Sequence, residues 1–216
     1  MAELAASLHL VDLICARLCH DLSGLVGTVN QALELAADDG VPAGEAFDLG
    51  RTAAGELMQR LKLLRAAWGP AGEDLDLTAL RALAAGLSNA RHLTLDLSGL
   101  PDGVVFGPAM GRMVLNLLLL ANDSLPAGGQ IVLSGGAEDV FIGIAGPRAA
   151  WPVGLPSCLM DEAAAYEACS SARTIQMPLT ALLARHTNLR LSLLMAGTEL
   201  MASTQGGPPP LRVTVR

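Results

Sequence analysis

The length of 216 residues fits one large domain or two small ones, and a hydrophobic content of 51% allows a sizeable core. Aromatic residues make up only 3% of the chain, so that core must be built from leucine, alanine, valine and methionine, which favours helices. The net charge of -7, with no conspicuous basic cluster, argues against a nucleic-acid partner.

The apolar stretches also argue against a membrane-bound or secreted protein. In the second half of the chain the longest apolar run covers 117–121, which is too short to cross a bilayer. The N-terminus lacks the basic segment that precedes the apolar part of a signal peptide. The four cysteines show no spacing typical of a disulfide framework. We therefore expect a cytoplasmic protein with reduced thiols and no membrane partner.

The first periodic segment runs from about Leu4 to Leu35 and predicts a long amphipathic helix that ends near Ala37. Apolar residues recur in it every three or four positions, which is the pattern of one buried helix face. The stripe consists of Leu4, Leu8, Val11, Cys15, Leu18, Leu22, Val26, Val29 and Leu33.

His20 lies outside this stripe, about 200° around the helix axis from Leu18 and Leu22. Its neighbours one and more turns further on are small or polar, namely Ser23, Gly24, Gly27 and Gln31. A glycine inside a helix costs about 1 kcal/mol relative to alanine, so two of them beside an outward-facing histidine call for a reason. We interpret them as clearance that lets another macromolecule approach the imidazole. The alternative is an ordinary solvated histidine beside glycines of no consequence.

A second helix is predicted from about Ala43 to Trp68, after turn-forming residues at 38–42. Its apolar stripe comprises Phe47, Gly50, Ala54, Leu57, Leu61, Leu64 and Trp68. Two helices joined by a short loop form an antiparallel hairpin, but they cannot bury both apolar faces fully on each other. We therefore predict a homodimer in which two hairpins form a four-helix bundle, with His20 of each protomer on the outside. Coverage of the hairpin by the rest of the chain is the alternative.

A turn-rich segment at 69–74 interrupts the periodicity and divides the chain into predicted domains 1–69 and 74–216. After it, helix patterns cover 77–87 (with Asp76 or Thr78 as cap), 107–123, 161–169 and 175–186, and a proline-containing stretch from 147 to 156 is predicted as loop. Strand patterns cover 93–97, 130–134, 140–144, 190–195, 199–203 and 211–215. This mixture predicts an α/β sandwich with helices on one face of a sheet, and an α+β fold for the whole chain.

The surroundings of His20 resemble the H-box of histidine-kinase dimerisation domains, where a surface histidine and an acidic residue lie on the first helix of a hairpin. Segment 113–121 followed by 128–131 is similar to the kinase N-box and the strand after it. A resemblance to the ChpT-type histidine phosphotransferases of alphaproteobacteria is closer and covers most of the chain. It rests on 18–22 continued by 26–35, on Gln176-Met177-Pro178 before a helix, and on the strand pattern at 190–193.

The chain departs from these patterns in four ways. Leu25 occupies the place where the H-box usually carries proline. Leu120 occupies the place of the second N-box asparagine, which holds magnesium in kinases, and leucine cannot ligate a hard cation. Residues 145–148 lack the carboxylate of the kinase Asp-x-Gly-x-Gly box, and no glycine-rich lid precedes residue 175. The resemblance therefore implies a kinase-like fold without its nucleotide site, and we expect no cofactor in this chain.

For a phosphotransferase, the resemblance implies that His20 takes a phosphoryl group from the receiver domain of a hybrid histidine kinase. The histidine then passes it to the aspartate of a response regulator, and the receivers bring the magnesium. Asp21 is the candidate to orient or deprotonate the imidazole. Arg17 is the candidate to stabilise the negative charge of the phosphoryl group or to pair with a receiver carboxylate. Either residue could instead be a solvated helix charge. The remaining docking surface would comprise Ser23, Gly24, Gly27 and Gln31.

Three hypotheses of function therefore remain open. The first is a histidine phosphotransferase of a phosphorelay that does not use ATP. The second is an ATP-dependent sensor-type histidine kinase, and the third is a non-catalytic dimeric adaptor of response regulators whose His20 is never phosphorylated. The other histidines, His9, His92 and His186, are expected to be structural or solvated.

Overall fold

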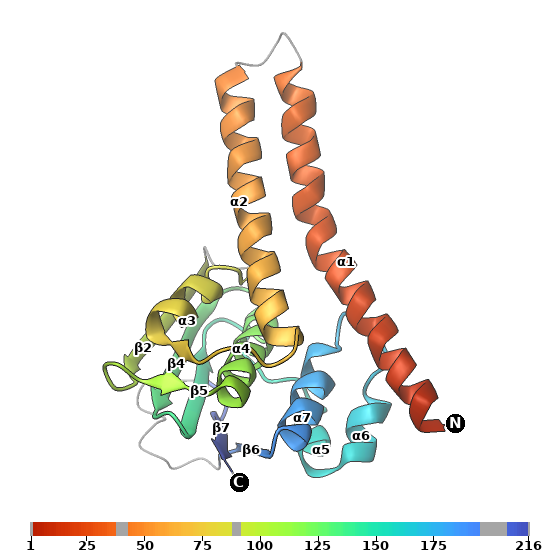
Figure 1. The fold of residues 1–216 in the computed structure, drawn as a ribbon, viewed down its shortest axis with the longest axis vertical. Coiled ribbons are helices and arrows are strands. Elements are labelled where there is room, and N and C mark those ends of the chain that lie inside the picture. Colours follow the sequence, from red (N-terminus) through yellow and green to blue (C-terminus); the bar gives the residue numbers. More distant parts are fainter. Residues whose placement is uncertain (1, 38–42, 88–91, 195–206, 216) are drawn as a thin grey trace.

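The computed structural model describes the chain except for residues 1, 38–42, 88–91, 195–206 and 216 (Figure 1). A long helical hairpin stands on a part built of helices and a sheet (Figure 1). Within the described ranges, no helix combines the length and the apolar character needed to cross a lipid bilayer.

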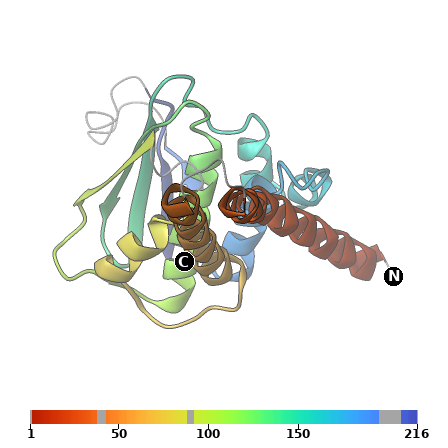
Figure 2. The same cartoon turned by 90° about the horizontal axis from the view of Figure 1, so that it is seen from above.

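The hairpin consists of α1 (Ala2–Ala36) and α2 (Ala43–Trp68), as predicted. The two helices lie side by side near their connection and diverge towards the rest of the molecule (Figures 1 and 2). Where they are close, the contact is made by small buried residues, because Ala32, Ala46 and Ala53 are at most 3% exposed. A Cβ atom on Gly50 would lie 3.2 Å from the Cβ of Ala32, so larger side chains there would push the helices apart.

The single chain buries only part of the α1 and α2 stripes, whose full burial was predicted for a dimer. In α1 the exposed stripe residues are 51–65% accessible, and Cys15 is exposed as well. In α2, Phe47 is 70% and Leu61 is 37% exposed. The reason is that small residues make the contact between the helices, whereas a partly different face of α1 meets the second part of the chain. That face adds Leu10, Leu13 and Ile14 to Leu18 and Leu22 of the stripe, and all five pack against the core.

The second part contains a five-stranded mixed sheet, as predicted for an α/β sandwich. Its strands, in spatial order, are β2 (Leu93–Gly99), β4 (Gly129–Gly135), β5 (Asp139–Ala145), β7 (Leu211–Val215) and β6 (Leu189–Leu193). Strands β2 and β4 are parallel, and the other neighbours are antiparallel. The register pairs Ile131 with Ile144 and Leu133 with Ile142, so four buried apolar side chains line up across β4 and β5.

Helices cover one side of this sheet (Figure 2). The central one is α4 (Pro108–Asp123), in which every residue from 113 to 122 is buried. Helix α7 (Gln176–His186) packs beside α4. Helix α3 (Leu77–Ala84) begins at the predicted cap, because the Asp76 carboxylate accepts a hydrogen bond of 2.7 Å from the backbone N–H of Ala79.

Three features escaped the sequence patterns. Two-residue strands β1 (Leu75–Asp76) and β3 (Val105–Phe106) form a small antiparallel pair that is too short to show periodicity. Part of the stretch predicted as loop is helix α5 (Leu155–Met160), where Pro156 lies in the first turn and so interrupts no hydrogen bond. It leads into α6 (Glu162–Glu167), which was predicted. The strand predicted at 199–203 lies outside the described residues.

The base of α2 is hydrogen-bonded to the helices of the second part. The buried Asn116 side chain of α4 donates to the carbonyl of Ala67 at 2.7 Å, and Arg112 Nε donates to the same oxygen at 3.2 Å. The indole N–H of Trp68 donates to Gln176 of α7 at 3.1 Å. The hairpin is therefore anchored at its base to the helices that cover the sheet, and this anchoring fixes where His20 lies. The division of the chain into domains at 69–74 stays a prediction.

Candidate functional site

His20 projects from the middle of α1 into solvent, with 71% of its side chain exposed. Gly24, about one turn further along, and Gly27 are also exposed, and a Cβ atom on either would meet no atom within 4 Å. The imidazole is thus approachable from outside, and the helix surface next to it is open.

Asp21 and Arg17 lie on the inward side of α1 and are not solvated helix charges. Their side chains are 8% and 11% exposed, and Arg17 Nε donates to Asp21 Oδ1 at 2.9 Å. The same carboxylate oxygen lies 3.4 Å from Nδ1 of His20. The carboxylate therefore lies between a guanidinium and the exposed imidazole.

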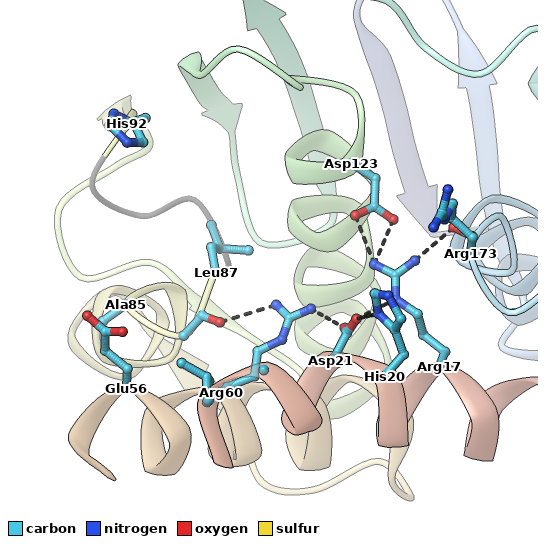
Figure 3. Close-up of a pocket in the computed structure, with 13 residues that line it drawn as sticks. Arg17, His20, Asp21, Glu56, Arg60, Ala85, Leu87, His92, Asp123 and Arg173 are labelled. Atoms are coloured by element: carbon cyan, nitrogen blue, oxygen red, sulfur yellow. Dashed lines mark hydrogen bonds and ion pairs between the residues drawn. The ribbon is translucent and has the colours of Figure 1, made fainter. Parts of the chain in front are cut away.

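Arg17 also connects α1 to two elements of the second part (Figure 3). Its Nη2 donates to both carboxylate oxygens of Asp123, at 3.0 and 3.2 Å, where α4 ends. Its Nη1 donates to the backbone carbonyl of Arg173, just before α7, at 2.8 Å. Since these bonds occupy all three nitrogens of the guanidinium, Arg17 acts here as a connection between helices.

Asp21 has a second cationic partner, Arg60 of α2, which is only 3% exposed. Arg60 Nη2 donates to Asp21 Oδ2, and Nη1 donates to the carbonyl of Gly86, beyond the end of α3, at 3.2 Å. Both oxygens of the carboxylate are thus held by guanidinium groups that approach from different helices.

This arrangement keeps both partners charged. Burial alone would raise the pKa of Asp21, but the guanidinium groups of Arg60 and Arg17 together outweigh it and hold that pKa below the ordinary value. Burial would likewise lower the pKa of Arg17, whereas the carboxylates of Asp123 and Asp21 raise it above the ordinary value. An ionised Asp21 accepts hydrogen bonds and is poorly suited to remove a proton.

These residues line a cleft of about 910 Å³ between the hairpin and the second part (Figure 3). One side is formed by Arg17, Asp123 and Arg173, and the opposite side by the end of α3 and by His92. His20 and Gly24 line it from α1, while Glu56 and Arg60 contribute from α2. The cleft is therefore a composite surface to which α1, α2, residues 85–87, His92, the end of α4 and Arg173 all contribute.

Residues 77–199, more than half of the chain, match the family model described as "Histidine phosphotransferase C-terminal domain". The chain belongs to this histidine phosphotransferase family. A protein phosphotransferase ChpT from Brucella abortus (strain 2308) is 27% identical over 206 residues, which cover 93% of this chain and 97% of the relative. The fold is shared with a bacterial phosphotransferase structure at a TM-score of 0.72 and 24% identity, covering 95% of this chain and 96% of that one.

The segment that resembles the kinase N-box is buried in this phosphotransferase. Asn116 is fully buried, and its Oδ1 accepts a 3.0 Å hydrogen bond from Gln176 Nε2 while its Nδ2 holds the base of α2. Leu120 is 1% exposed and belongs to the core. Asn122 is buried as well, and its Nδ2 lies 3.5 Å from Asp123 Oδ1.

The predicted site residues of the phosphotransferase are only partly brought together. His20, Asp21, Arg17 and Gly24 line one cleft, whereas Ser23, Gly27 and Gln31 are exposed on α1 without lining it. The hydroxyl of Ser23 donates to the Cys19 carbonyl at 2.6 Å within the helix.

The other histidines differ in their surroundings. His9 Nε2 lies 2.9 Å from the carbonyl of Cys169, so this residue joins α1 to the end of α6 and has the structural place expected. His92 is exposed at the edge of the cleft, and His186 ends α7.

Sequence reasoning missed Arg60, Asp123 and Arg173. For Arg60 a signal was present: it continues a row spaced by seven residues, Ala46, Ala53, Arg60 and Ala67, all of which are buried. An arginine in such a row points to a buried charge that needs a partner. Asp123 and Arg173 carry no comparable pattern, because only the tertiary fold brings them to Arg17.

Proposed function

We propose that His20 is the phosphoacceptor of a phosphorelay, which receives phosphoryl groups from one receiver domain and gives them to another without using ATP. Membership of the histidine phosphotransferase family supports phosphotransfer with receiver domains in a two-component phosphorelay. The observation that carries the proposal for His20 is its 71% exposed imidazole at an open cleft, beside a carboxylate that two guanidinium groups hold in place.

The proposed reaction proceeds in two displacements at phosphorus. In the first, the lone pair of Nε2 attacks the phosphoryl group of a receiver's phospho-aspartate, the N–P bond forms, and the aspartate leaves as a carboxylate. In the second, the carboxylate of an acceptor receiver attacks the same phosphorus and the N–P bond breaks. Phosphoryl transfer of this kind depends mainly on positioning and on stabilising charge, and the receivers bring the magnesium.

Asp21 supports this chemistry as an acceptor. A neutral imidazole carries one N–H, and an ionised carboxylate beside Nδ1 favours the tautomer that keeps this hydrogen on Nδ1. Nε2 is then left with its lone pair towards solvent. When the N–P bond forms, the ring gains positive charge, and the negative charge of Asp21 at 3.4 Å from Nδ1 stabilises it.

Arg17 acts in this proposal by holding α1 to the second part. Its hydrogen bonds to Asp21, Asp123 and the Arg173 carbonyl leave it as a connection between helices instead of a ligand for the phosphoryl group. Independence from ATP is supported by the burial of Leu120 and by the hydrogen bonds that commit Asn116 to α2 and α7.

We further propose that the protein is a homodimer joined through its hairpins. Large apolar side chains on both helices are exposed in the single chain, among them Val26, Leu33, Phe47 and Met58 at 51–70%. Large apolar side chains exposed on both helices of a hairpin favour pairing with a second copy into a four-helix bundle.

The test uses the full chain and a receiver domain of a hybrid histidine kinase that carries a labelled phospho-aspartate. Transfer should place the label on this chain as an acid-labile, alkali-stable phosphohistidine. His20→Gln should abolish the labelling, whereas His92→Gln, which changes another histidine at the edge of the same cleft, should leave it intact.

Each other outcome contradicts a named part of the proposal. Undiminished labelling of His20→Gln would show that another residue is the phosphoacceptor. Labelling by ATP and magnesium alone would favour the kinase hypothesis. A chain that binds the receiver but never takes up label would be the dimeric adaptor.

A further inference from the structure

We propose that Arg60 is a positioning residue for phosphotransfer: it clamps Asp21 from α2, keeps the carboxylate beside Nδ1 of His20, and so presents Nε2 as the reacting nitrogen. The inference rests on the proposed function of His20 and extends it to a residue that touches neither the imidazole nor the phosphoryl group.

The first support is the rigid setting of Arg60. It is 3% exposed, and its two Nη atoms are divided between Asp21 Oδ2 and the carbonyl of Gly86. Gly86 itself is pressed against α2, because a Cβ atom there would lie 2.4 Å from the Gln59 carbonyl oxygen and 2.9 Å from Leu63 Cβ. The carbonyl that anchors Arg60 therefore cannot shift easily.

The second support is that Arg60 and Arg17 hold Asp21 in different ways. Arg17 lies one turn before Asp21 on the same helix, so their pair moves with α1. Arg60 approaches from α2 and is also bonded to the end of α3. Only Arg60 therefore fixes the position of the Asp21 carboxylate relative to the cleft wall formed by α2 and α3. Through that carboxylate it also fixes the His20 ring.

The third support is how little else restrains the imidazole. Among the hydrogen bonds of the described residues, the 3.4 Å approach to Asp21 Oδ1 is the polar contact of this ring, and most of its surface faces solvent. Without Arg60, the carboxylate can rotate towards Arg17 and away from Nδ1. The ring would then exchange between tautomers and orientations, and a smaller fraction would offer Nε2 in the direction of an incoming receiver.

Misplacement of a reacting atom by about 1 Å can slow a reaction by about 100-fold. We therefore expect Arg60→Met to slow transfer from the receiver by about 10- to 100-fold. Arg60→Lys should slow it less than Arg60→Met, because an ammonium group keeps the charge beside Asp21 but does not reproduce the planar fork that reaches Gly86 at the same time. The matched control is Arg51→Met on the same helix, whose side chain is 71% exposed and pairs with Asp48.

The experiment measures two quantities on each full-length variant: the rate of label transfer from the phosphorylated receiver, and the ring ¹⁵N chemical shifts of His20 at neutral pH. The His20 signals are identified by their absence in His20→Gln. Wild type and Arg51→Met should show mainly the tautomer with hydrogen on Nδ1 and equal rates. Arg60→Lys and Arg60→Met should show a mixture of tautomers together with slower transfer.

The outcomes separate this inference from the proposed function. If wild type takes no label, the function proposed for His20 is wrong. The tautomer measurement still tests whether Arg60 holds Asp21 beside Nδ1 of His20. If wild type is labelled but both Arg60 variants keep its rate and its tautomer, Arg60 does not position the ring. Slower transfer with an unchanged tautomer would also overturn the inference, because the effect would then be on the fold alone. If Arg60→Met does not fold, Arg60→Lys decides by the same criteria.

Discussion

The two ends of the hairpin are stabilised by different physical means. At the tip (residues 26–36 and 43–55), small residues bring the helices together and large apolar side chains face solvent. At the base (residues 10–22 and 57–68), leucines join the core of the second part, and buried charges pair across α1 and α2.

This difference separates two tasks on one pair of helices. The base buries leucines and paired charges within the chain, so it fixes the position of His20 relative to the cleft, although Val11 and Met58 stay exposed there. The tip exposes its large apolar side chains and buries only small ones, so it is the part best suited to contact another copy. Variants at the base should change the stability of the single chain, and matched variants at the tip should not.

The largest effect on stability is expected for Asp21→Asn. This change leaves the buried guanidinium of Arg60 without its anion, and breaking a buried pair costs about 3 kcal/mol or more in the free energy of unfolding. The control is Asp48→Asn at the tip, where Arg51 and Asp48 are both about 70% exposed and the loss should stay below about 1 kcal/mol. Urea unfolding at neutral pH measures both, and equal losses would contradict the comparison.

The same residue predicts an acid dependence. Because the pKa of Asp21 is lowered in the folded state, its ionised form stabilises the fold at pH above the ordinary aspartate value of 3.8. That contribution is lost as the pH falls below 3.8 towards the pKa of the folded state. The free energy of unfolding of wild type should therefore fall more steeply below pH 4 than that of Asp21→Asn. Parallel curves would show that the carboxylate is not held by its two arginines.

At the tip, the combined change Leu33→Glu and Phe47→Glu should break the proposed dimer. These side chains are 65% and 70% exposed in the single chain, so their replacement creates no cavity in it. Burying the new carboxylates between two copies is costly, and we expect the dissociation constant to rise by about 100-fold or more. Sedimentation equilibrium measures this. An unchanged association would place the dimer contact elsewhere or exclude it.

Asn116→Leu tests the base at its junction with α4. The change removes a buried donor to the Ala67 carbonyl and the acceptor for Gln176 Nε2, and it should lower the free energy of unfolding by about 2 kcal/mol. The matched change at the tip is Asn30→Leu, because the exposed Asn30 amide donates to Glu34 of the same helix at 2.9 Å. Its effect should lie within about 0.5 kcal/mol, as is usual for surface positions. Thermal unfolding of the two variants compares them directly.

The sequence was informative where a local pattern determines the structure. The hairpin, the central helix after Pro108 and the strands at 130–134 and 140–144 follow from periodicity and caps, because these depend on neighbours in the chain. The exposure of His20 followed from its angle on the helix. Helix α5 was missed because proline in a first turn looks the same in sequence as proline in a loop.

The sequence was misleading where burial depends on which partner a helix has. The stripe of α1 through Leu8 and Val11 has the correct period, but α1 meets its own chain with the neighbouring face that carries Leu10 and Ile14. Likewise, the sequence left open whether Asp21 and Arg17 serve the site or are solvated helix charges, since nothing local reveals that Arg60 and Asp123 lie opposite them. These contacts join residues 39 and 106 positions apart, so they come from tertiary packing and leave no periodic signal.

Replacing Gly24 should have a small effect on stability, opposite in sign to the losses expected for Asp21→Asn and Asn116→Leu. It lies inside α1 near His20, and a Cβ atom there would meet nothing within 4 Å, so Gly24→Ala should stabilise the chain by up to about 1 kcal/mol. A larger side chain should keep this helix gain yet slow transfer, because it would project into the space through which a receiver reaches His20. The control for the helix gain is Gly55→Leu on α2. The surroundings of Gly55 are equally open, and Gly55 does not line the cleft. If Gly24→Leu transfers as fast as Gly55→Leu, the glycine beside the histidine does not serve as clearance, and its cost to the helix has no functional explanation.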